Sequence, residues 1–307
     1  GPREVLTMAH DTKVGWIGVG MMGEPMARNV MQAGFPLRVY NRTRDKVRDL
    51  EKDGAGVADS VADLASGCDV LVSMISADAA LEAVTIADGG AFAAMSAGSV
   101  FIDMSTVSPA MSARVALVAA EKGIHYLRAP VSGSIGLAAA GTLTIFASGP
   151  EQVFEASRSL FEAMGGKLFH VGEAEEARYL KLSINMMVGI TAGMMAEALT
   201  LSEKGGVDWN QMIDIIGSSA VASPLVGYKV DALKNRDFTP AFPAWMMSKD
   251  FDLALDAARD ESIPLPITSL VRQHWSAMEA TGRGELDFFA YVTLMEHLSG
   301  LGDKSGD

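Results

Sequence analysis

Short apolar runs alternate with amphipathic segments over the first half of the chain. The runs are rich in Val, Ile or aromatic residues and are bounded by Gly, Asp or Ser, which is typical of buried strands. They lie at 13–18, 37–41, 69–75 and 99–104, with later ones at 142–148 and 167–170. Segments with helical spacing lie at 22–33, 44–52, 77–84 and 109–122. This alternation predicts a mainly parallel sheet that is covered by helices on both faces.

The second half of the chain has a helical pattern. Residues 173–204 contain no proline and no long β-branched run, so they favour one long helix. Further helical segments lie at 209–216, 249–259, 267–279 and 287–299. We therefore predict an α/β domain over 13–172 and an all-helical domain over 173–307, joined by the long helix.

Composition narrows the function classes. The 307 residues carry 25 basic and 38 acidic side chains, a net charge of −13, and no basic stripe, which disfavours nucleic acid as a partner. The apolar stretch 182–196 is short for a membrane span and is expected to be a buried helix. The single cysteine, Cys68, cannot form an internal disulfide, which fits a reducing cytoplasm. The five histidines show no metal-ligand spacing, so no metal is expected.

A glycine-rich turn follows the first predicted strand and opens the first helix. Gly18, Gly20 and Gly23, with Met21 and Met22 between them, fit the pattern G-x-G-x-x-G. Glycines there allow a tight turn, close approach of a pyrophosphate and close helix–strand packing, while the helix start offers free N–H groups. In this context the motif predicts a Rossmann-type dinucleotide-binding domain.

The end of the second predicted strand bears on which cofactor binds. An NAD enzyme commonly has Asp or Glu there, to accept a hydrogen bond from the ribose. This chain has Asn41, Arg42 and Thr43, followed by Arg44. These side chains can donate to a 2′-phosphate and none repels it, so NADP is favoured over NAD. The alternative is that the two arginines are solvated residues at a helix start.

Lys181, near the start of the long helix, is the candidate general acid/base. Its apolar neighbours suggest partial burial, which lowers the pKa of a lysine. Asn185, four residues on, lies on the same helix face and can orient the substrate or the lysine. The alternative is a surface lysine on an amphipathic helix.

From Lys13 to about Leu298 the chain resembles the β-hydroxyacid dehydrogenases, the family of 3-hydroxyisobutyrate dehydrogenase and of the tartronate, glyoxylate and succinic semialdehyde reductases. The resemblance rests on motifs in the family's order. They are Gly18–Gly23 with Met26, Asp103–Thr106, Ala129–Gly133, Lys181 with Asn185, and Lys249-Asp250 before Leu253-Ala254.

The resemblance implies a role for each matching residue. Lys181 is the general acid/base and Asn185 orients the substrate. Ser132 and Gly133 hold the substrate carboxylate, Ser132 being counted with the catalytic residues. Cofactor contacts are implied for Met74, Ile75, Thr106 and Lys249. The implied enzyme is a cytoplasmic homodimer or homotetramer that interconverts a small β-hydroxy acid and its semialdehyde.

The chain departs from the family's motifs at several positions. Arg128 stands where the family has Asp, Ser134 replaces a glycine, and Ile184 replaces an asparagine; Glu173–Glu176 replace the glycines before the helix. Ser134 adds a hydroxyl beside the implied carboxylate site. Arg128 is either a contact to a second acidic group of the substrate or an outward salt-bridge partner, and we favour the outward position because most arginines are exposed.

Two other functions are compatible with the same architecture. One is imine reduction, although relatives with that activity usually lack a lysine at position 181. The other is a catalytically silent NADP(H)-binding module, which the joint presence of Lys181 and Asn185 disfavours.

Overall fold

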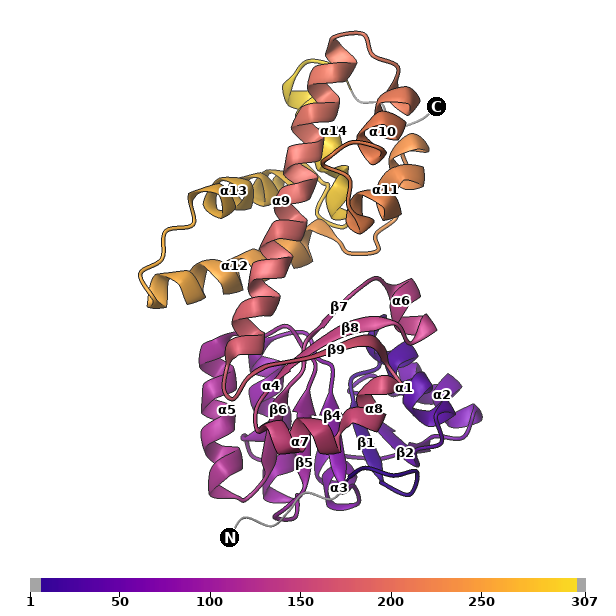
Figure 1. The fold of residues 1–307 in the computed structure, drawn as a ribbon, viewed down its shortest axis with the longest axis vertical. Helices are drawn as coiled ribbons and strands as arrows, with labels where there is room; N and C mark the ends of the chain where they lie inside the picture. Colours follow the sequence, from indigo (N-terminus) through magenta and orange to yellow (C-terminus); the bar gives the residue numbers. More distant parts are fainter. Residues whose placement is uncertain (1–6, 303–307) are drawn as a thin grey trace. The chain divides into compact units, whose positions relative to one another are not determined.

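A computed structural model of the chain describes residues 7–302. The last positions of the predicted helical domain, 303–307, lie outside the described residues. The chain divides into two compact units between Lys181 and Leu182, within the long helix α9 (Glu176–Lys204) (Figure 1). The predicted domain bounds, 13–172 and 173–307, remain predictions.

The first unit is built on one sheet. Its strands are β1 (Val14–Ile17), β2 (Leu37–Tyr40), β3 (Gly56–Val57), β4 (Val70–Ser73), β5 (Val100–Asp103), β6 (His125–Arg128), β7 (Val131–Ser132), β8 (Leu143–Ser148) and β9 (Gly165–Gly172). Their order is β3-β2-β1-β4-β5-β6-β8-β7, with β9 also paired to β8. Strands β1 to β6 pair in parallel, while β8 is antiparallel to β6 and β7. The order β3-β2-β1-β4-β5-β6 is that of a Rossmann fold, and it reverses direction between β1 and β4.

Helices cover both faces of this sheet (Figure 1). They are α1 (Gly23–Gln32), η1 (Arg44–Val47), α2 (Arg48–Lys52), α3 (Val61–Ser66), α4 (Asp78–Thr85), η2 (Ala91–Ala93), α5 (Pro109–Glu121), α6 (Ile135–Ala140), α7 (Glu151–Ala156) and α8 (Arg158–Glu162). Successive strand residues point to opposite faces, so Val70 and Val72 join the core on one side and Leu71 the core on the other. The continuous apolar runs of the sequence are thus strands buried on both sides.

The second unit is helical. From Leu182 onward it contains the rest of α9, followed by α10 (Trp209–Gly217), α11 (Pro224–Lys234), α12 (Ala244–Asp260), α13 (Pro266–Ala280), η3 (Phe288–Ala290) and α14 (Tyr291–Leu298). Its core centres on Trp275, whose ring packs edge-on against Phe251 at 5.8 Å and Tyr291 at 5.0 Å between centroids. The fold is therefore a Rossmann-type α/β domain followed by an all-α domain, with a long helix at the joint, as the sequence predicts.

Helix α9 packs through glycines within the second unit. A Cβ on Gly189 would lie 2.4 Å from Cε1 of Phe251, and one on Gly193 would lie 3.3 Å from the Tyr291 ring. These glycines serve intrachain packing. Among the described residues only α9 is long and apolar enough to cross a membrane; 44% of its most apolar window is buried within the protein. The core helix of a soluble protein meets the same criteria, so this is weak evidence for a membrane span.

Candidate active site

The glycine turn has the three properties that a dinucleotide site requires. Gly18 has a φ of +97°, and a Cβ there would lie 2.0 Å from the Met74 carbonyl oxygen. A Cβ on Gly23 would lie 2.1 Å from the Gly18 carbonyl oxygen, so helix and turn touch there. At Gly20 a Cβ would have no heavy atom within 4 Å, and the residue is exposed. The first and third glycines make the turn, and the second leaves its backbone open to a ligand.

Helix α1 begins directly at this turn. Its N-cap residue, Met22, makes no side-chain capping hydrogen bond within residues 7–302. The Glu24 N–H donates to the Gly20 carbonyl oxygen (3.0 Å) and Pro25 has no N–H, so in the first turn the Gly23 N–H is the donor that a ligand could use. Such a helix start attracts a phosphate through its N–H groups and its dipole. Met21, in the turn, is 65% exposed. The turn and the helix start therefore fit the pyrophosphate of a dinucleotide.

The parallel strands bring the predicted cofactor residues to one edge of the sheet. Ile17 at the end of β1 pairs with Tyr40 of β2 and with Ser73 of β4, and Ser73 pairs with Asp103 of β5. The residues that follow these strand ends are Gly18, Asn41, Met74 and Met104, and Ile75 and Thr106 come shortly after. This edge lies where the strand order reverses, the usual ligand position in open α/β sheets.

The segment after β2 braces the glycine turn and also exposes an arginine side chain that can donate hydrogen bonds. The Asn41 Oδ1 accepts a hydrogen bond from the Val19 N–H (3.1 Å), and its Nδ2 donates to the Thr43 carbonyl oxygen (2.9 Å). Asn41 thus braces the glycine turn. Arg44 pairs with Asp59 at 2.8 Å, which matches the solvated alternative for this residue. Arg42 is exposed and makes no side-chain hydrogen bond or ion pair within residues 7–302.

Lys181 lies beside the segment that resembles a carboxylate-binding motif. Its Nζ donates a hydrogen bond to the Val131 carbonyl oxygen at 2.7 Å, and the side chain is half-buried. Ser132, which follows in β7, is also half-buried. Gly133 has a φ of +143°, and a Cβ there would lie 2.8 Å from Cδ2 of Leu143. The structure thus brings the candidate amine next to the Ser132–Gly133 segment.

Ser134 is a helix cap. Its Oγ accepts a hydrogen bond from the Leu137 N–H at 3.3 Å, at the start of α6. That role accounts for a serine at this position, because serine is among the preferred N-cap residues. Its part in substrate binding remains a prediction.

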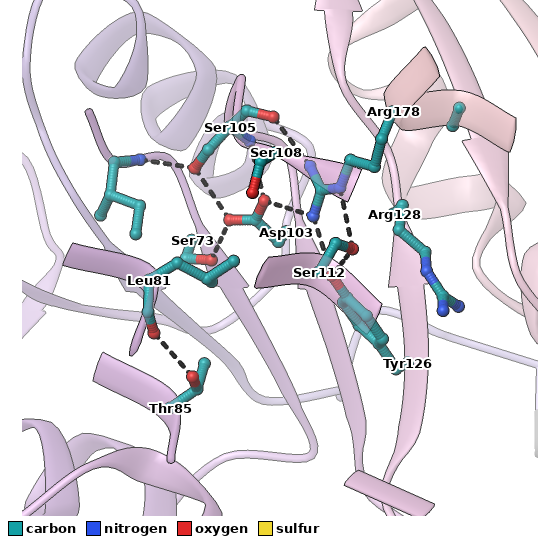
Figure 2. Close-up of polar contacts among 12 residues, drawn as sticks. Ser73, Leu81, Thr85, Asp103, Ser105, Ser108, Ser112, Tyr126, Arg128 and Arg178 are labelled. Carbon is teal, nitrogen blue, oxygen red and sulfur yellow. Dashed lines mark hydrogen bonds and ion pairs between the residues drawn. The ribbon is translucent and has the colours of Figure 1, made fainter. Parts of the chain in front are cut away.

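A buried polar network joins the first turn of α9 to the sheet (Figure 2). Arg178, 1% exposed, donates from Nη2 to Oδ2 of Asp103 (2.7 Å) and to the Tyr126 hydroxyl (2.8 Å). It also donates from Nη1 to the Ser105 carbonyl oxygen (2.8 Å) and from Nε to Oγ of Ser112 (3.1 Å). Burial alone lowers the pKa of Arg178, but Tyr126 and Asp103 raise that pKa by more. The guanidinium therefore stays charged in the core.

Arg128 corrects one expectation from the sequence. It does form a salt bridge, with Glu175, but it is only 6% exposed, so the predicted outward position is wrong. Its guanidinium also lies over the Tyr126 ring, 4.3 Å from the centroid. Glu175 supplies the buried counter-charge, which explains why an arginine is tolerated inside the unit.

The second unit holds its own group of predicted site residues. The Asn185 Nδ2 donates to Oδ2 of Asp250 at 2.7 Å. Asp250, in α12, is 5% exposed, and its neighbour Lys249 is half-buried. Asp250 thus fixes the Asn185 amide so that its oxygen points away from the carboxylate.

Sequence reasoning gave no role to Arg178, and none to Asp103 or Asp250 beyond membership of a motif. For Asp103 a signal exists, since an acidic residue at the end of an apolar run needs a buried partner. Asp250 follows Ser248 and Lys249, so the sequence carries no such signal for it. Arg178 has no such signal, because one arginine at a helix start is usually solvated. Among residues 7–302 no group of three or more His, Cys, Asp or Glu side chains could hold a metal ion.

Two family models match this chain. Residues 13–172 match the family model of the NAD-binding domain of 6-phosphogluconate dehydrogenase. Residues 176–295 match the model described as "NAD-binding of NADP-dependent 3-hydroxyisobutyrate dehydrogenase".

Individual proteins are similar over nearly the whole chain. The 2-(hydroxymethyl)glutarate dehydrogenase of Eubacterium barkeri is 33% identical, over 97% of this chain and 100% of that protein. Glyoxylate/succinic semialdehyde reductase 1 of Arabidopsis thaliana is 31% identical, over 91% and 97%. The crystal structure of a 3-hydroxyisobutyrate dehydrogenase from Salmonella typhimurium superposes with a TM-score of 0.84 at 26% identity, over 92% and 100%.

Proposed function

Because the chain belongs to the β-hydroxyacid dehydrogenase family, we propose that it interconverts a small β-hydroxy acid and its semialdehyde. Membership makes it an oxidoreductase that uses a nicotinamide dinucleotide. The proposal goes further in three respects: the substrate class, a preference for NADP(H), and Lys181 as general acid/base.

The observation that supports the lysine most directly is its hydrogen bond to the Val131 carbonyl oxygen. That bond holds the amine beside Ser132 and Gly133. In our proposal the Ser132 hydroxyl and the Gly133 N–H donate to the substrate carboxylate, which orients the substrate. The bound nicotinamide supplies the carbon that accepts the hydride in oxidation and donates it in reduction.

Lys181 moves the proton. In oxidation its neutral amine accepts the proton of the substrate hydroxyl, while the substrate carbon that bears this hydroxyl loses a hydride. In reduction its ammonium returns the proton to the forming alkoxide, so charge and protons balance in both directions. The Asn185 amide, held by Asp250, donates or accepts a hydrogen bond at the substrate oxygens.

The NADP preference is supported by the end of β2. Asn41, Arg42 and Thr43 carry no carboxylate, and the Arg42 guanidinium is exposed. A guanidinium in this position can form charge-assisted hydrogen bonds with a 2′-phosphate. The family model for residues 176–295 is itself named for an NADP-dependent enzyme.

The substrate carries at least one carboxylate. Arg128 is an unsuitable contact for a second one, because it is buried and donates to Glu175 from both Nε and Nη2. We further propose a cytoplasmic homodimer or homotetramer with no nucleic-acid or membrane partner. Large apolar side chains exposed on α9 support self-association, namely Met187 at 65% and Leu201 at 77% exposure, and light scattering in solution measures it.

A spectrophotometric screen tests the proposed function. Small semialdehydes with NADPH or NADH, and β-hydroxy acids with NADP or NAD, are followed by the absorbance of the reduced nicotinamide. We expect turnover of at least one three- or four-carbon pair, with a lower KM for NADP(H). Cofactor binding without turnover of any pair would support the silent binding module, and turnover of cyclic imines alone would support imine reduction.

A further inference from the structure

Arg178 contacts four different parts of the first unit from one buried guanidinium. Its acceptors come from the end of β5, the segment that follows β5, helix α5 and strand β6 (Figure 2). A guanidinium offers five N–H donors in a fixed planar fork, so it can hold several acceptors in one defined geometry. The first turn of α9 is therefore tied to these elements at one point.

The network continues from Arg178 towards the cofactor edge. The second oxygen of Asp103, Oδ1, accepts hydrogen bonds from Oγ of Ser73 (2.6 Å) and of Ser105 (2.8 Å). The Ser105 Oγ in turn accepts a hydrogen bond from the backbone N–H of Ile75 (2.8 Å). A continuous chain of hydrogen bonds thus runs from Arg178 through Asp103 and Ser105 to Ile75.

Both ends of this chain adjoin residues of the proposed mechanism. Thr106, the neighbour of Ser105, is predicted to lie near the nicotinamide, and the backbone at Ile75 is predicted to flank the cofactor. Lys181 comes three residues after Arg178, on the same side of α9. Buried networks in which each group is satisfied are rigid, so the network keeps these positions fixed relative to one another.

We propose that Arg178 is a positioning residue for the reaction: it holds the Lys181 amine in register with the two segments predicted to contact the cofactor, 74–75 and 105–106. This inference rests on the proposed function. Anchoring of α9 alone does not need this arginine, because the Arg128–Glu175 pair already ties the residues before the helix to β6. What Arg178 adds is the connection to the segments after β4 and β5.

Kinetics of Arg178→Lys test the proposal, with Arg128→Lys as the matched control. Both variants keep a buried positive charge and lose the planar fork. For Arg178→Lys we expect kcat to fall by about 100-fold, the effect of an ångström-scale misplacement, with little change in the Kd of NADPH. The deuterium isotope effect with NADPH labelled at C4 should rise, because misaligned hydride transfer becomes rate-limiting. Arg128→Lys should keep a kcat and an isotope effect close to wild type.

A purely structural role for Arg178 predicts a different pattern. It would lower the melting temperature in both variants and leave kcat per folded molecule and the isotope effect unchanged. That result, or an equal loss of kcat in Arg128→Lys, overturns the proposal. If Arg178→Lys does not fold, Ser112→Ala takes its place, since it removes one acceptor and keeps the ion pair; a smaller fall in kcat with the same isotope signature is then expected.

Amide hydrogen exchange on the protein without cofactor separates this inference from the proposed function. We expect Arg178→Lys to accelerate exchange at Ile75 and at 104–107, and Arg128→Lys to accelerate it only around 173–176. Unchanged exchange at Ile75 overturns the positioning role, whatever the activity. A wild-type protein that turns over no semialdehyde overturns the proposed function instead, and exchange still decides whether Arg178 holds these segments.

Discussion

The Nζ atom of Lys181 donates a hydrogen bond to the carbonyl oxygen of Val131 over 2.7 Å. A backbone carbonyl is a fixed acceptor, because strand β7 sets its position through pairing with β8. The amine therefore has a defined place beside Ser132 and Gly133, although it sits on a flexible four-carbon side chain. Such fixed placement is what a proton-transferring group requires.

Arg42→Gln is expected to weaken NADPH binding and to leave NADH binding nearly unchanged. The variant removes a charge-assisted contact to the 2′-phosphate, which is worth about 1.5–3 kcal/mol, or roughly 10- to 100-fold in Kd. Titration of protein fluorescence with each cofactor measures the effect. Arg44→Gln is the matched control, because Arg44 already pairs with Asp59. Equal weakening of both cofactors by Arg42→Gln would remove the basis for the NADP preference.

Gly20→Ala should leave the fold intact and impair cofactor binding. A Cβ at this position meets no protein atom within 4 Å, so the melting temperature without cofactor should stay at the wild-type value. A bound pyrophosphate needs the backbone at this point, so the Kd of NADPH should rise by about tenfold or more. Gly23→Ala gives the contrast: its Cβ would lie 2.1 Å from the Gly18 carbonyl oxygen, so it should lower the melting temperature itself. Wild-type affinity in Gly20→Ala contradicts the assignment of this turn.

Gly189→Ala should destabilise the second unit. The added methyl would lie 2.4 Å from Cε1 of Phe251, which is fully buried and packs against Trp275. Overpacking of this kind costs about 1–3 kcal/mol. Gly227→Ala, in α11, is the control, since it has open space around it and should gain about 0.4–1 kcal/mol. Urea denaturation measures both, and a stabilised Gly189→Ala would show that the helix packing is looser than described.

Cys68 should make the protein less stable at alkaline pH. Burial raises the pKa of the Cys68 thiol from the ordinary 9.0 to about 12. The unfolded chain loses this proton near pH 9 and the folded chain only near pH 12. The stability due to this shift is therefore fully present below pH 9 and is lost as the pH rises to about 12.

Urea midpoints at pH 8 and pH 11 measure that loss in wild type and in Cys68→Ala. The decrease should be smaller in the variant, while burial of Tyr126, whose pKa is also raised, leaves a remaining decrease in both. The folded thiol should also react slowly with a disulfide reagent at pH 8. Rapid reaction, or an identical pH response in the two proteins, contradicts the raised pKa of this half-buried thiol.

The strands and helices that the sequence predicts are those with an uninterrupted pattern. The runs at 13–18 and 99–104 became β1 and β5, because each is buried on both faces and contains only apolar or small residues at its centre. Strand β6 was not predicted, since it begins with His125 and ends with Arg128. Its arginine is acceptable only because Glu175, 47 positions away in sequence, lies against it. A contact of that range leaves no local pattern.

The features of the candidate site likewise differ in whether a local sequence pattern indicates them. The glycine turn has a local signal, because its spacing and its place between a predicted strand and a predicted helix can be read from neighbouring residues. The Met74 carbonyl oxygen that lies against Gly18 is distant in sequence and could not be predicted. The partner of Asn185 is Asp250, on a different helix, and no spacing in the sequence indicates that pair. Helix α11 could have been predicted, because Ser223 caps it and Pro224 stands at its first position, a recognised start signal.

The catalytic role of Lys181 is tested most directly by kcat and the NADPH dissociation constant of Lys181→Met, measured beside Lys167→Met. Methionine keeps the approximate length and the helix preference of lysine but has no ionisable group, so it cannot transfer a proton. Lys167 is exposed on β9 and serves as the control for loss of a lysine. We predict that Lys181→Met lowers kcat by about 10²- to 10⁴-fold and leaves NADPH affinity unchanged, while Lys167→Met alters neither. A Lys181→Met protein with near wild-type kcat, or one that loses cofactor affinity as much as turnover, would contradict the account.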